Sequence, residues 1–455
     1  MKKGPDRGRA ALLLSTFCMA FVAAMTSPLE AVIELDVHEV LGEITDSSAS
    51  IFVQLGQGIE SSFSFKAGYD VLPHGPDHDY PFETSVQTGL DDDQRLDFLL
   101  DGLTANMTYY YSLAGRESEE EEWVWRPERR FVTPRSAGAP FRFCVITDLH
   151  YHPITPLKQQ VCRNLEADTP DFVVTIGDMV PAANQAGGEP IDCEIAYNPF
   201  PDGIHSQEDA DYHYKRFMYF LMNFFSHSSM IVWINGNHEG LAGFQSTCPQ
   251  YNYLLNARRK YLPLLAHDEP NAFYGDLVWG DVHIIWLDPL AFAGYDPLMW
   301  NDPTGYVLGD VQKDWLTATL TASTARWKLI FAHTLFGGAG PSFECSPGNA
   351  YARGNANFVD NPGTDQILIQ SLMEQYGVDA YIYGHDHMYS ISEYNNVKYI
   401  LAGGGITPDW QDCLYRYYLP WTVIDEIGHL RFDVEPDRLM LSYIKTALDE
   451  NNGEV

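Results

Sequence analysis

The sequence predicts an α/β (α+β) domain preceded by an all-β sandwich. Between residues 29 and 134, β-rich runs such as Ala49–Leu55 and Thr108–Leu113 are separated by Gly, Asp and Pro turn signals, a spacing typical of a β-sandwich. From Phe141 onward, apolar runs alternate with amphipathic segments, a pattern that indicates strands and helices around a buried sheet. The Pro-, Gly- and Ser-containing stretch 134–140 is the expected linker. We therefore predict domains at 29–134 and 141–450.

The first 27 residues have the pattern of a signal peptide. Four basic residues within the first nine precede the apolar stretch Ala10–Ala24, and small residues follow it. The alternative is an uncleaved N-terminal anchor. No later segment is long and apolar enough to span a bilayer, which takes roughly 20 residues. We therefore expect a secreted or periplasmic protein with no stable membrane span after signal cleavage.

Composition excludes some partners. The 455 residues are 45% hydrophobic, enough for a large core in two domains. With 28 basic against 62 acidic residues, the formal charge is -34, which repels nucleic acid and anionic membranes. No nucleic-acid partner is expected. A small phosphorylated substrate would need local positive charge, and bound metal ions can supply it.

The cysteines favour disulfides over a cysteine-based metal or redox site. Cys18 lies in the predicted signal, and six cysteines remain. In an oxidising compartment this even number predicts one to three disulfides, whose pairing the sequence does not reveal. Cys144 lies within an apolar run and is expected to be a buried thiol. No Cys-x-x-Cys occurs, so neither a zinc ribbon nor a redox motif is indicated.

Five apolar runs of the second domain end in Asp, His or Asn. These runs deliver Asp148 and His150; Asp178; Asn237, His238 and Glu239; His333; and His385 and His387. Such a layout is expected when one cleft at the carboxyl edge of a sheet gathers side chains from separate strands. The last run continues into Gly384-His385-Asp386-His387. If it stayed extended, both histidine rings would point to the same side.

Each of these residues has a structural alternative when it is taken alone. Asp148 or Asp178 is compatible with a turn, Asn237 with a left-handed residue beside Gly236, and His333 with a core histidine. Their joint placement favours metal binding. The predicted ligands are seven nitrogen or oxygen donors, more than one ion needs, whereas two divalent cations that share a bridging carboxylate would use them all: Asp148, His150, Asp178, Asn237, His333, His385 and His387.

The ordered motifs resemble the calcineurin-like metallophosphoesterase superfamily across nearly all of residues 141–410. The resemblance implies a two-layer β-sandwich flanked by helices, a four-layer αββα arrangement, with a dinuclear metal centre at one edge. It also implies that Asp178 bridges the two ions, which would be two divalent cations such as Fe, Zn or Mn. The implied ligands of the first ion are Asp148, His150, Asp178 and His387, and those of the second are Asp178, Asn237, His333 and His385.

The resemblance also assigns the residues around the implied centre. His238 would face the substrate and is the candidate to protonate the leaving oxygen or to stabilise the transition-state charge. Apart from the resemblance, Glu239 is a candidate to orient a histidine by hydrogen bonding. The first domain resembles the fibronectin type III-like domain of purple acid phosphatases and related exported phosphatases. Purple acid phosphatases, however, place a tyrosine ligand three residues after the bridging aspartate. Here that position is Pro181, which argues against a ferric-tyrosinate centre.

Together these features predict an exported dinuclear-metal phosphoesterase. It would hydrolyse phosphomonoesters by in-line attack of a metal-bridging hydroxide, because two cations both neutralise the phosphoryl oxygens and acidify a bound water. Alternatives are a phosphodiesterase or nucleotide-cleaving hydrolase on the same site, or a catalytically silent binding module. Tyr151 and His152 are either pocket-lining residues or ordinary loop residues.

Overall fold

The structure is a computed structural model of the chain. It describes residues 37–55, 63–85, 87–88, 95–151, 154–180, 206–236, 239, 249–263, 265, 273–289, 308–334, 365–385, 387–404, 422–424 and 426–448. The predicted signal peptide lies outside these residues, as do the predicted ligand Asn237 and His238, which is predicted to face the substrate. His152, Pro181 and Asp386 also lie outside them. Five of the seven cysteines also lie outside, so the predicted disulfides stay a prediction.

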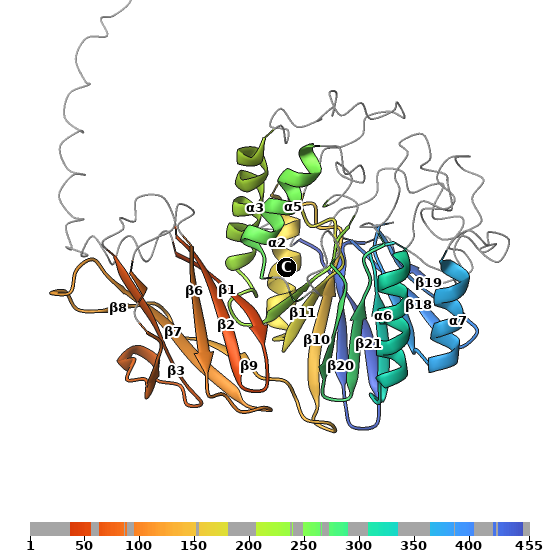
Figure 1. The fold of residues 1–455 in the computed structure, drawn as a ribbon, viewed down its shortest axis with the longest axis horizontal. Coiled ribbons are helices and arrows are strands. Elements are labelled where there is room, and N and C mark those ends of the chain that lie inside the picture. Colours follow the sequence, from red (N-terminus) through yellow and green to blue (C-terminus); the bar gives the residue numbers. More distant parts are fainter. Residues whose placement is uncertain are drawn as a thin grey trace, which may run out of the picture.

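The first part of the chain forms two antiparallel sheets (Figure 1). One has the strand order β1 (Val37–Ile44), β2 (Ser48–Leu55), β6 (Arg95–Asp101). The other has the order β4 (Phe82–Glu83), β3 (Ser64–Asp70), β7 (Thr108–Arg116), β8 (Val124–Trp125); β5 (Gln87–Thr88) pairs with β3, and β9 (Arg129–Val132) pairs with β7. A short 3-10 helix, η1 (Gly75–Asp77), follows β3. The predicted all-β region is thus present, and its likeness to fibronectin type III stays a prediction.

The second part contains two mixed sheets. The five-stranded sheet has the order β12 (Met230–Trp233), β11 (Phe172–Thr175), β10 (Phe141–Ile146), β20 (Gly428–Val434), β21 (Leu439–Lys445). The seven-stranded sheet has the order β13 (Gly275–Trp279), β14 (Val282–Trp286), β15 (Trp327–Phe331), β16 (Ala380–Tyr383), β18 (Val397–Ala402), β17 (Tyr389–Tyr394), β19 (Thr422–Ile424). Each sheet contains a run of neighbouring parallel strands: β12, β11 and β10 in one, and β14, β15, β16 and β18 in the other.

Three apolar clusters stack these sheets and five helices into four layers, as Figure 1 shows. The inner faces of the two sheets share one core, in which Phe143 and Phe432 stack near Phe331 and Ile382. The helices α2 (Pro156–Ala167), α3 (Gln207–Met222) and α5 (Pro249–Tyr261) cover the outer face of the five-stranded sheet. The helices α6 (Gly309–Ala322) and α7 (Gln366–Tyr376) cover the outer face of the seven-stranded sheet. The predicted αββα fold is confirmed.

Local sequence explains where these elements begin and end. The strands β11, β12 and β16 are buried at every position, so their sequences are almost entirely apolar, and β10 is interrupted only by the partly buried Arg142. Helix α2 begins after Thr155, whose side chain accepts a hydrogen bond from the Lys158 amide, with Pro156 at its first position. Helix α7 ends at Gly377, whose φ of +61° suits a left-handed cap.

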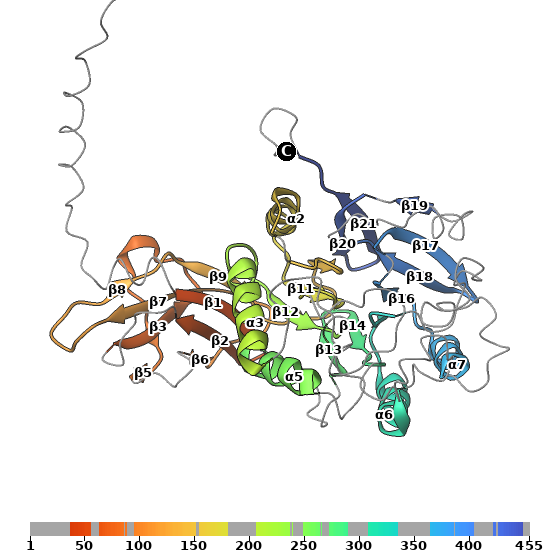
Figure 2. The same cartoon turned by 90° about the horizontal axis from the view of Figure 1, so that it is seen from above.

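Helix α3 joins the front sheets to the second part of the chain (Figure 2). The Leu41 amide donates to the Ser226 carbonyl at 2.9 Å, and the Tyr111 hydroxyl donates to the His227 carbonyl at 2.9 Å. The rings of His38 and Tyr219 lie 4.0 Å apart. These buried hydrogen bonds to backbone carbonyls indicate a fixed contact between the two parts rather than a loose tether.

The five apolar runs expected to deliver site residues are all strands, but they do not share one sheet. Strands β10, β11 and β12 belong to the five-stranded sheet, and β15 and β16 belong to the seven-stranded sheet. The prediction of one cleft at the edge of a single sheet is therefore wrong: the carboxyl ends of two stacked sheets meet. Among the described residues, none of the helices is both long and apolar enough to cross a membrane.

Candidate metal centre

Six of the predicted metal ligands are described, and all follow the carboxyl ends of strands. Strand β10 precedes Asp148 and His150, β11 precedes Asp178, β15 precedes His333, and β16 precedes His385 and His387. Because parallel strands of both sheets end on the same side, side chains more than 200 residues apart in sequence come together.

The six side chains form two groups of three. Potential ligand atoms of Asp148, His150 and His387 all lie within 4.8 Å of one another, and the same holds for Asp178, His333 and His385. In the first group, Nε2 of His387 lies 3.3 Å from Oδ1 of Asp148. In the second, Nε2 of His333 lies 3.1 Å from Oδ2 of Asp178 and 4.0 Å from Oδ1 of Asp148, so the groups adjoin.

His385 and His387 lie in different groups. The expectation that an extended segment would point both rings to the same side is wrong, because β16 ends at Tyr383 and both histidines have left-handed backbone, with φ of +79° and +54°. The division between two groups is the one that the family resemblance implies.

The Asp148 carboxylate is held through one oxygen. Its Oδ2 accepts hydrogen bonds from the Thr147 hydroxyl at 2.7 Å and the His385 amide at 2.9 Å. Its Oδ1 is buried and has no hydrogen-bond partner among the described residues. A buried carboxylate oxygen is costly unless something positive meets it. A cation between Asp148, His150 and His387 satisfies that requirement, so the first group fits a metal ion.

The tautomer of His333 is fixed by the backbone. Its Nδ1 lies 2.6 Å from the Ile176 carbonyl oxygen and donates to it, which leaves Nε2 facing the carboxylates. Ligand histidines commonly hold their second nitrogen this way. Burial by itself lowers the pKa of His333, but Asp178 and Asp148 outweigh it and raise the pKa to about 10. The carboxylates thus create a negative potential at Nε2 that a metal ion would neutralise in place of a proton.

The backbone around the centre is strained. Asp148, His150, Asp178, His385 and His387 all have positive φ, between +40° and +79°. Non-glycine residues rarely adopt this conformation, and it concentrates at functional sites where the surrounding structure enforces it. Here the strain turns successive side chains toward one point instead of alternating them across a strand.

Two glycines let neighbouring turns approach closely. A Cβ on Gly177, whose φ is +82°, would lie 2.2 Å from the Gly236 nitrogen, and a Cβ on Gly236 would lie 2.3 Å from the Asp178 nitrogen. No other residue fits at either position without displacing backbone. The turn that carries Asp178 therefore lies directly against the turn that precedes Asn237.

Glu239 binds backbone amides. Its Oε2 accepts from the amides of Gly236 and Asp178, each at 2.8 Å, and its Oε1 accepts from those of Met179 and Val180, at 2.8 and 3.2 Å. The hydrogen bonds described for this carboxylate thus hold the two turns together rather than orient a histidine. Burial, reinforced by the nearby charge of Asp178, raises its pKa.

Tyr151 belongs to the core. Its side chain is fully buried against Phe217, and its hydroxyl donates to the His213 carbonyl at 3.0 Å. Of the two interpretations from sequence, the structure supports an ordinary structural residue over a pocket-lining one.

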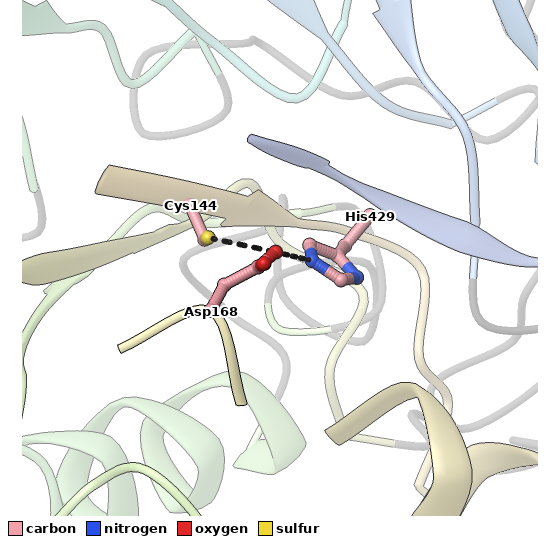
Figure 3. Close-up of side chains that lie close together, drawn as sticks. All are labelled: Cys144, Asp168 and His429. Carbon is pink, nitrogen blue, oxygen red and sulfur yellow. Dashed lines mark hydrogen bonds and ion pairs between the residues drawn. The ribbon is translucent and has the colours of Figure 1, made fainter. Parts of the chain in front are cut away.

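A third group, Cys144, Asp168 and His429, lies at the C-terminal end of helix α2, which Asp168 caps. Figure 3 shows the three side chains. Nε2 of His429 lies 2.9 Å from Oδ2 of Asp168, Arg431 donates to Oδ1 at 2.9 Å, and the Cys144 sulfur lies 4.0 Å from Oδ2. These contacts balance the Asp168 charge without a metal. Cys144 is a free buried thiol, as predicted, and burial raises its pKa well above the usual value. We interpret this group as structural.

Sequence reasoning missed Asp288, which also follows a strand. The apolar run Val282–Leu287 ends at this residue, and its side chain is fully buried and bonded to Asn235. The sequence signal was the same as at the other five runs, namely a polar residue directly after an apolar run.

Comparisons with known proteins agree with this geometry. The model of the family described as calcineurin-like phosphoesterase matches residues 141–389, more than half of the chain. No curated protein matches the chain. A solved structure titled "Structure of PhoD" is similar over 89% of this chain and 88% of its own, with 13% identity and a TM-score of 0.65, which indicates a shared fold. A Plasmodium protein described as GAP50, the anchor in the inner membrane complex, aligns over 67% of this chain and 84% of its own at 15% identity, with a TM-score of only 0.37. The chain therefore belongs to the calcineurin-like phosphoesterase family and is a metal-dependent phosphoric ester hydrolase.

Proposed function

We propose that the chain is an exported phosphoesterase that binds two divalent metal ions and hydrolyses phosphomonoesters. The observation that supports two ions is the division of the described donors into two adjoining groups, each with one carboxylate and two histidines. Two ions also supply the concentrated positive charge that a dianionic monoester needs on a strongly acidic chain.

Each ion has an assigned set of residues. Asp178 lies between the groups, because His333 of its own group and His150 of the other both approach its Oδ2, at 3.1 and 4.0 Å. It is the proposed bridge. The other proposed ligands are Asp148, His150 and His387 for the first ion, and Asn237, His333 and His385 for the second. The donor types suit ions such as Fe, Zn or Mn.

The chain's own residues prepare the site before substrate arrives. Thr147 and the His385 amide aim Oδ1 of Asp148 into the first group, and the Ile176 carbonyl aims Nε2 of His333 into the second. When bound, such ions neutralise phosphoryl oxygens and lower the pKa of water from about 15.7 to roughly 7. His238 is the proposed donor of a proton to the leaving oxygen, a role that typically contributes about 10²- to 10⁴-fold to the rate.

The metal assignment is tested with His385→Ala and His387→Ala. Elemental analysis of each purified variant should find a different ion depleted, because the two side chains lie in different groups. His283→Ala is the matched control, since His283 is buried but bonded to Asp276 and Ser323 instead. Equal loss of both ions in both variants would count against the division.

The ester class is tested with p-nitrophenyl phosphate and its bis-ester. We expect faster turnover of the monoester, whose extra negative charge two ions accommodate. Preference for the bis-ester would favour the alternative, a phosphodiesterase on the same site. Wild-type protein that cleaves neither ester with Zn, Mn or Fe would favour a silent binding module, and a His238→Ala variant with wild-type turnover would refute the role given to His238.

Export is tested by expressing the full chain and sequencing the amino terminus of the mature protein. The positive and then apolar pattern of residues 1–27 supports cleavage near residue 27 and release from the cytoplasm. Membrane-bound protein that retains these residues would indicate an anchor.

A further inference from the structure

Asp288 forms a buried tie between the two sheets. It follows strand β14 of the seven-stranded sheet, and its side chain is 0% exposed. Its Oδ2 accepts hydrogen bonds from Nδ2 of Asn235, which follows strand β12 of the five-stranded sheet, and from the Phe273 amide, both at 2.9 Å. The tie therefore crosses between the sheets on the side where both metal groups assemble.

Helix α6 fixes Asp288 in turn. The Asp288 amide donates to Oε1 of Gln312 at 2.9 Å, and Nε2 of Gln312 donates back to the Asp288 carbonyl at 3.0 Å. Gln312 is itself fully buried. A paired, two-way hydrogen bond of this kind leaves the backbone of Asp288 little freedom, so its carboxylate presents a fixed acceptor to Asn235.

Asn235 lies one residue before Gly236 and two before Asn237. Oδ1 of Asn235 is buried and has no hydrogen-bond partner among the described residues, so the bond to Asp288 is the one described contact that orients its side chain. Gly236 has no spare room, because a Cβ there would lie 2.3 Å from Oδ1 of Asp178. A shift of Asn235 would therefore move Gly236, and with it the turn that packs against Asp178 of the second metal group.

Charge neutralisation alone does not explain the tie. Burial lowers the pKa of Arg258. The nearby charges of Asp288 and Glu239 raise this pKa, but by less than burial lowers it. Its described hydrogen bond, however, goes to the Trp233 carbonyl, at 3.0 Å. Oδ2 of Asp288 accepts hydrogen bonds from the Asn235 side chain and the Phe273 amide. These contacts therefore fix the position of Asn235 in addition to meeting a charge.

We infer that Asp288, acting through Asn235, is a positioning residue that sets the backbone before Asn237 and so orders the second metal group. The inference rests on the proposed function, because it gives Asn237 the role of a ligand to the second ion. A residue that supports a ligand in this way typically changes metal affinity by about 10- to 100-fold when it is lost.

The test compares Asp288→Ala, Asp288→Asn and Asn235→Ala with wild type. Protein stripped with a chelator is titrated with Mn²⁺ by calorimetry, and kcat and KM for p-nitrophenyl phosphate are measured at saturating Mn²⁺. Asp288→Ala should weaken one of the two binding steps about 10- to 100-fold and leave the other unchanged. Asp288→Asn keeps an acceptor oxygen for Asn235 and should retain most of the affinity. The fall in activity should lie mainly in kcat.

Asp171→Ala is the matched control, because Asp171 is another buried carboxylate that ties two segments. It bonds Arg135 at 2.6 and 3.1 Å, at the start of β11 and away from the metal groups. This variant should lose thermal stability and keep both Mn²⁺ binding steps. If Asp288 has only a structural role, Asp288→Ala should likewise lose thermal stability and keep both Mn²⁺ binding steps.

A double-mutant cycle separates the outcomes further. Combining Asp288→Ala with Asn235→Ala should cost no more Mn²⁺ affinity than either change alone, since both break the same bond. Additive losses, equal weakening of both steps, or unchanged binding in Asn235→Ala would each overturn the inference while the proposed function stands. If Asp288→Ala does not fold, Asn235→Ala alone decides the matter. Wild-type protein that binds no Mn²⁺ would overturn the proposed function, and the inference with it.

Discussion

Replacing Glu239 by Gln should destabilise the chain even when no metal is bound. Each carboxylate oxygen accepts two backbone hydrogen bonds, Oε2 from Gly236 and Asp178 and Oε1 from Met179 and Val180. A glutamine offers one acceptor oxygen, and its NH₂ group would face two N–H donors. The change therefore leaves two buried amides without a partner, in whichever direction the side-chain amide is turned.

The magnitude follows from those two orphaned amides. A buried donor without a partner costs roughly 1–3 kcal/mol, which gives about 2–6 kcal/mol for two. Removing the charge offsets part of this cost, because burial and the neighbouring Asp178 disfavour the ionised carboxylate and raise the pKa of Glu239. We expect a net loss of about 2–4 kcal/mol in the free energy of unfolding.

Urea denaturation of the chelated protein, followed by tryptophan fluorescence, measures this loss. The control is Glu83→Gln, which breaks an ion pair with Lys66 at 2.6 Å, where the Glu83 side chain is 40% exposed. Such a pair contributes about 1 kcal/mol or less. If Glu239→Gln unfolds at the same urea concentration as Glu83→Gln, the hydrogen bonds to Glu239 do not hold the turns together and the reasoning fails.

Three further predictions concern the metal, the two buried thiols, and the group at the C-terminal end of α2. A chelator should abolish ester hydrolysis, and added Mn²⁺ or Zn²⁺ should restore it in an activity assay; hydrolysis that survives exhaustive chelation would contradict the metal requirement. Cys144 and Cys162 should resist iodoacetamide until the chain unfolds, as peptide mass spectrometry would show, because burial raises the pKa of both thiols. Burial raises the pKa of Asp168, but hydrogen bonds from His429 and Arg431 outweigh it and lower the pKa below its usual value. Its contribution to stability is therefore present above about pH 4 and lost as the pH falls through the lowered pKa, so Asp168→Asn should flatten the dependence of the urea midpoint as the pH falls below about 4; an unchanged slope there would refute this.

The sequence predicts the strands of the centre well because each is short, apolar and buried on both faces. Phe172–Thr175 and Ala380–Tyr383, for example, are buried at every position, so their sequences contain no polar interruption until the strand ends. The first polar residues after such a run then mark the carboxyl end of the sheet. For this reason Asp178 and His385 could be placed at the centre before any pairing of strands was known.

The pairing itself could not be predicted in this way. The runs that end at Asp178 and His333 carry no signal that β11 and β15 belong to different sheets. Contacts between residues distant in sequence determine which sheet a strand joins. The supporting contacts were hidden for a related reason. Glu239 and Asp288 act through hydrogen bonds to backbone amides and to Asn235, and such partners leave no periodic signal in the sequence.

The turn Gly384–His387 shows how the two sheets produce a centre that neither could make alone. Gly384 is packed so closely that a Cβ there would lie 2.2 Å from the Thr147 hydroxyl, and the next amide, that of His385, donates to Asp148 of the other sheet. The turn is thus fixed against β10 before it delivers either ring. Its left-handed backbone then sends His385 toward Asp178 and His387 toward Asp148. Because His385 and His387, two residues apart, contribute to different groups, the short backbone between them limits the distance between the groups, as the two proposed ions would need in order to act on one phosphoryl group.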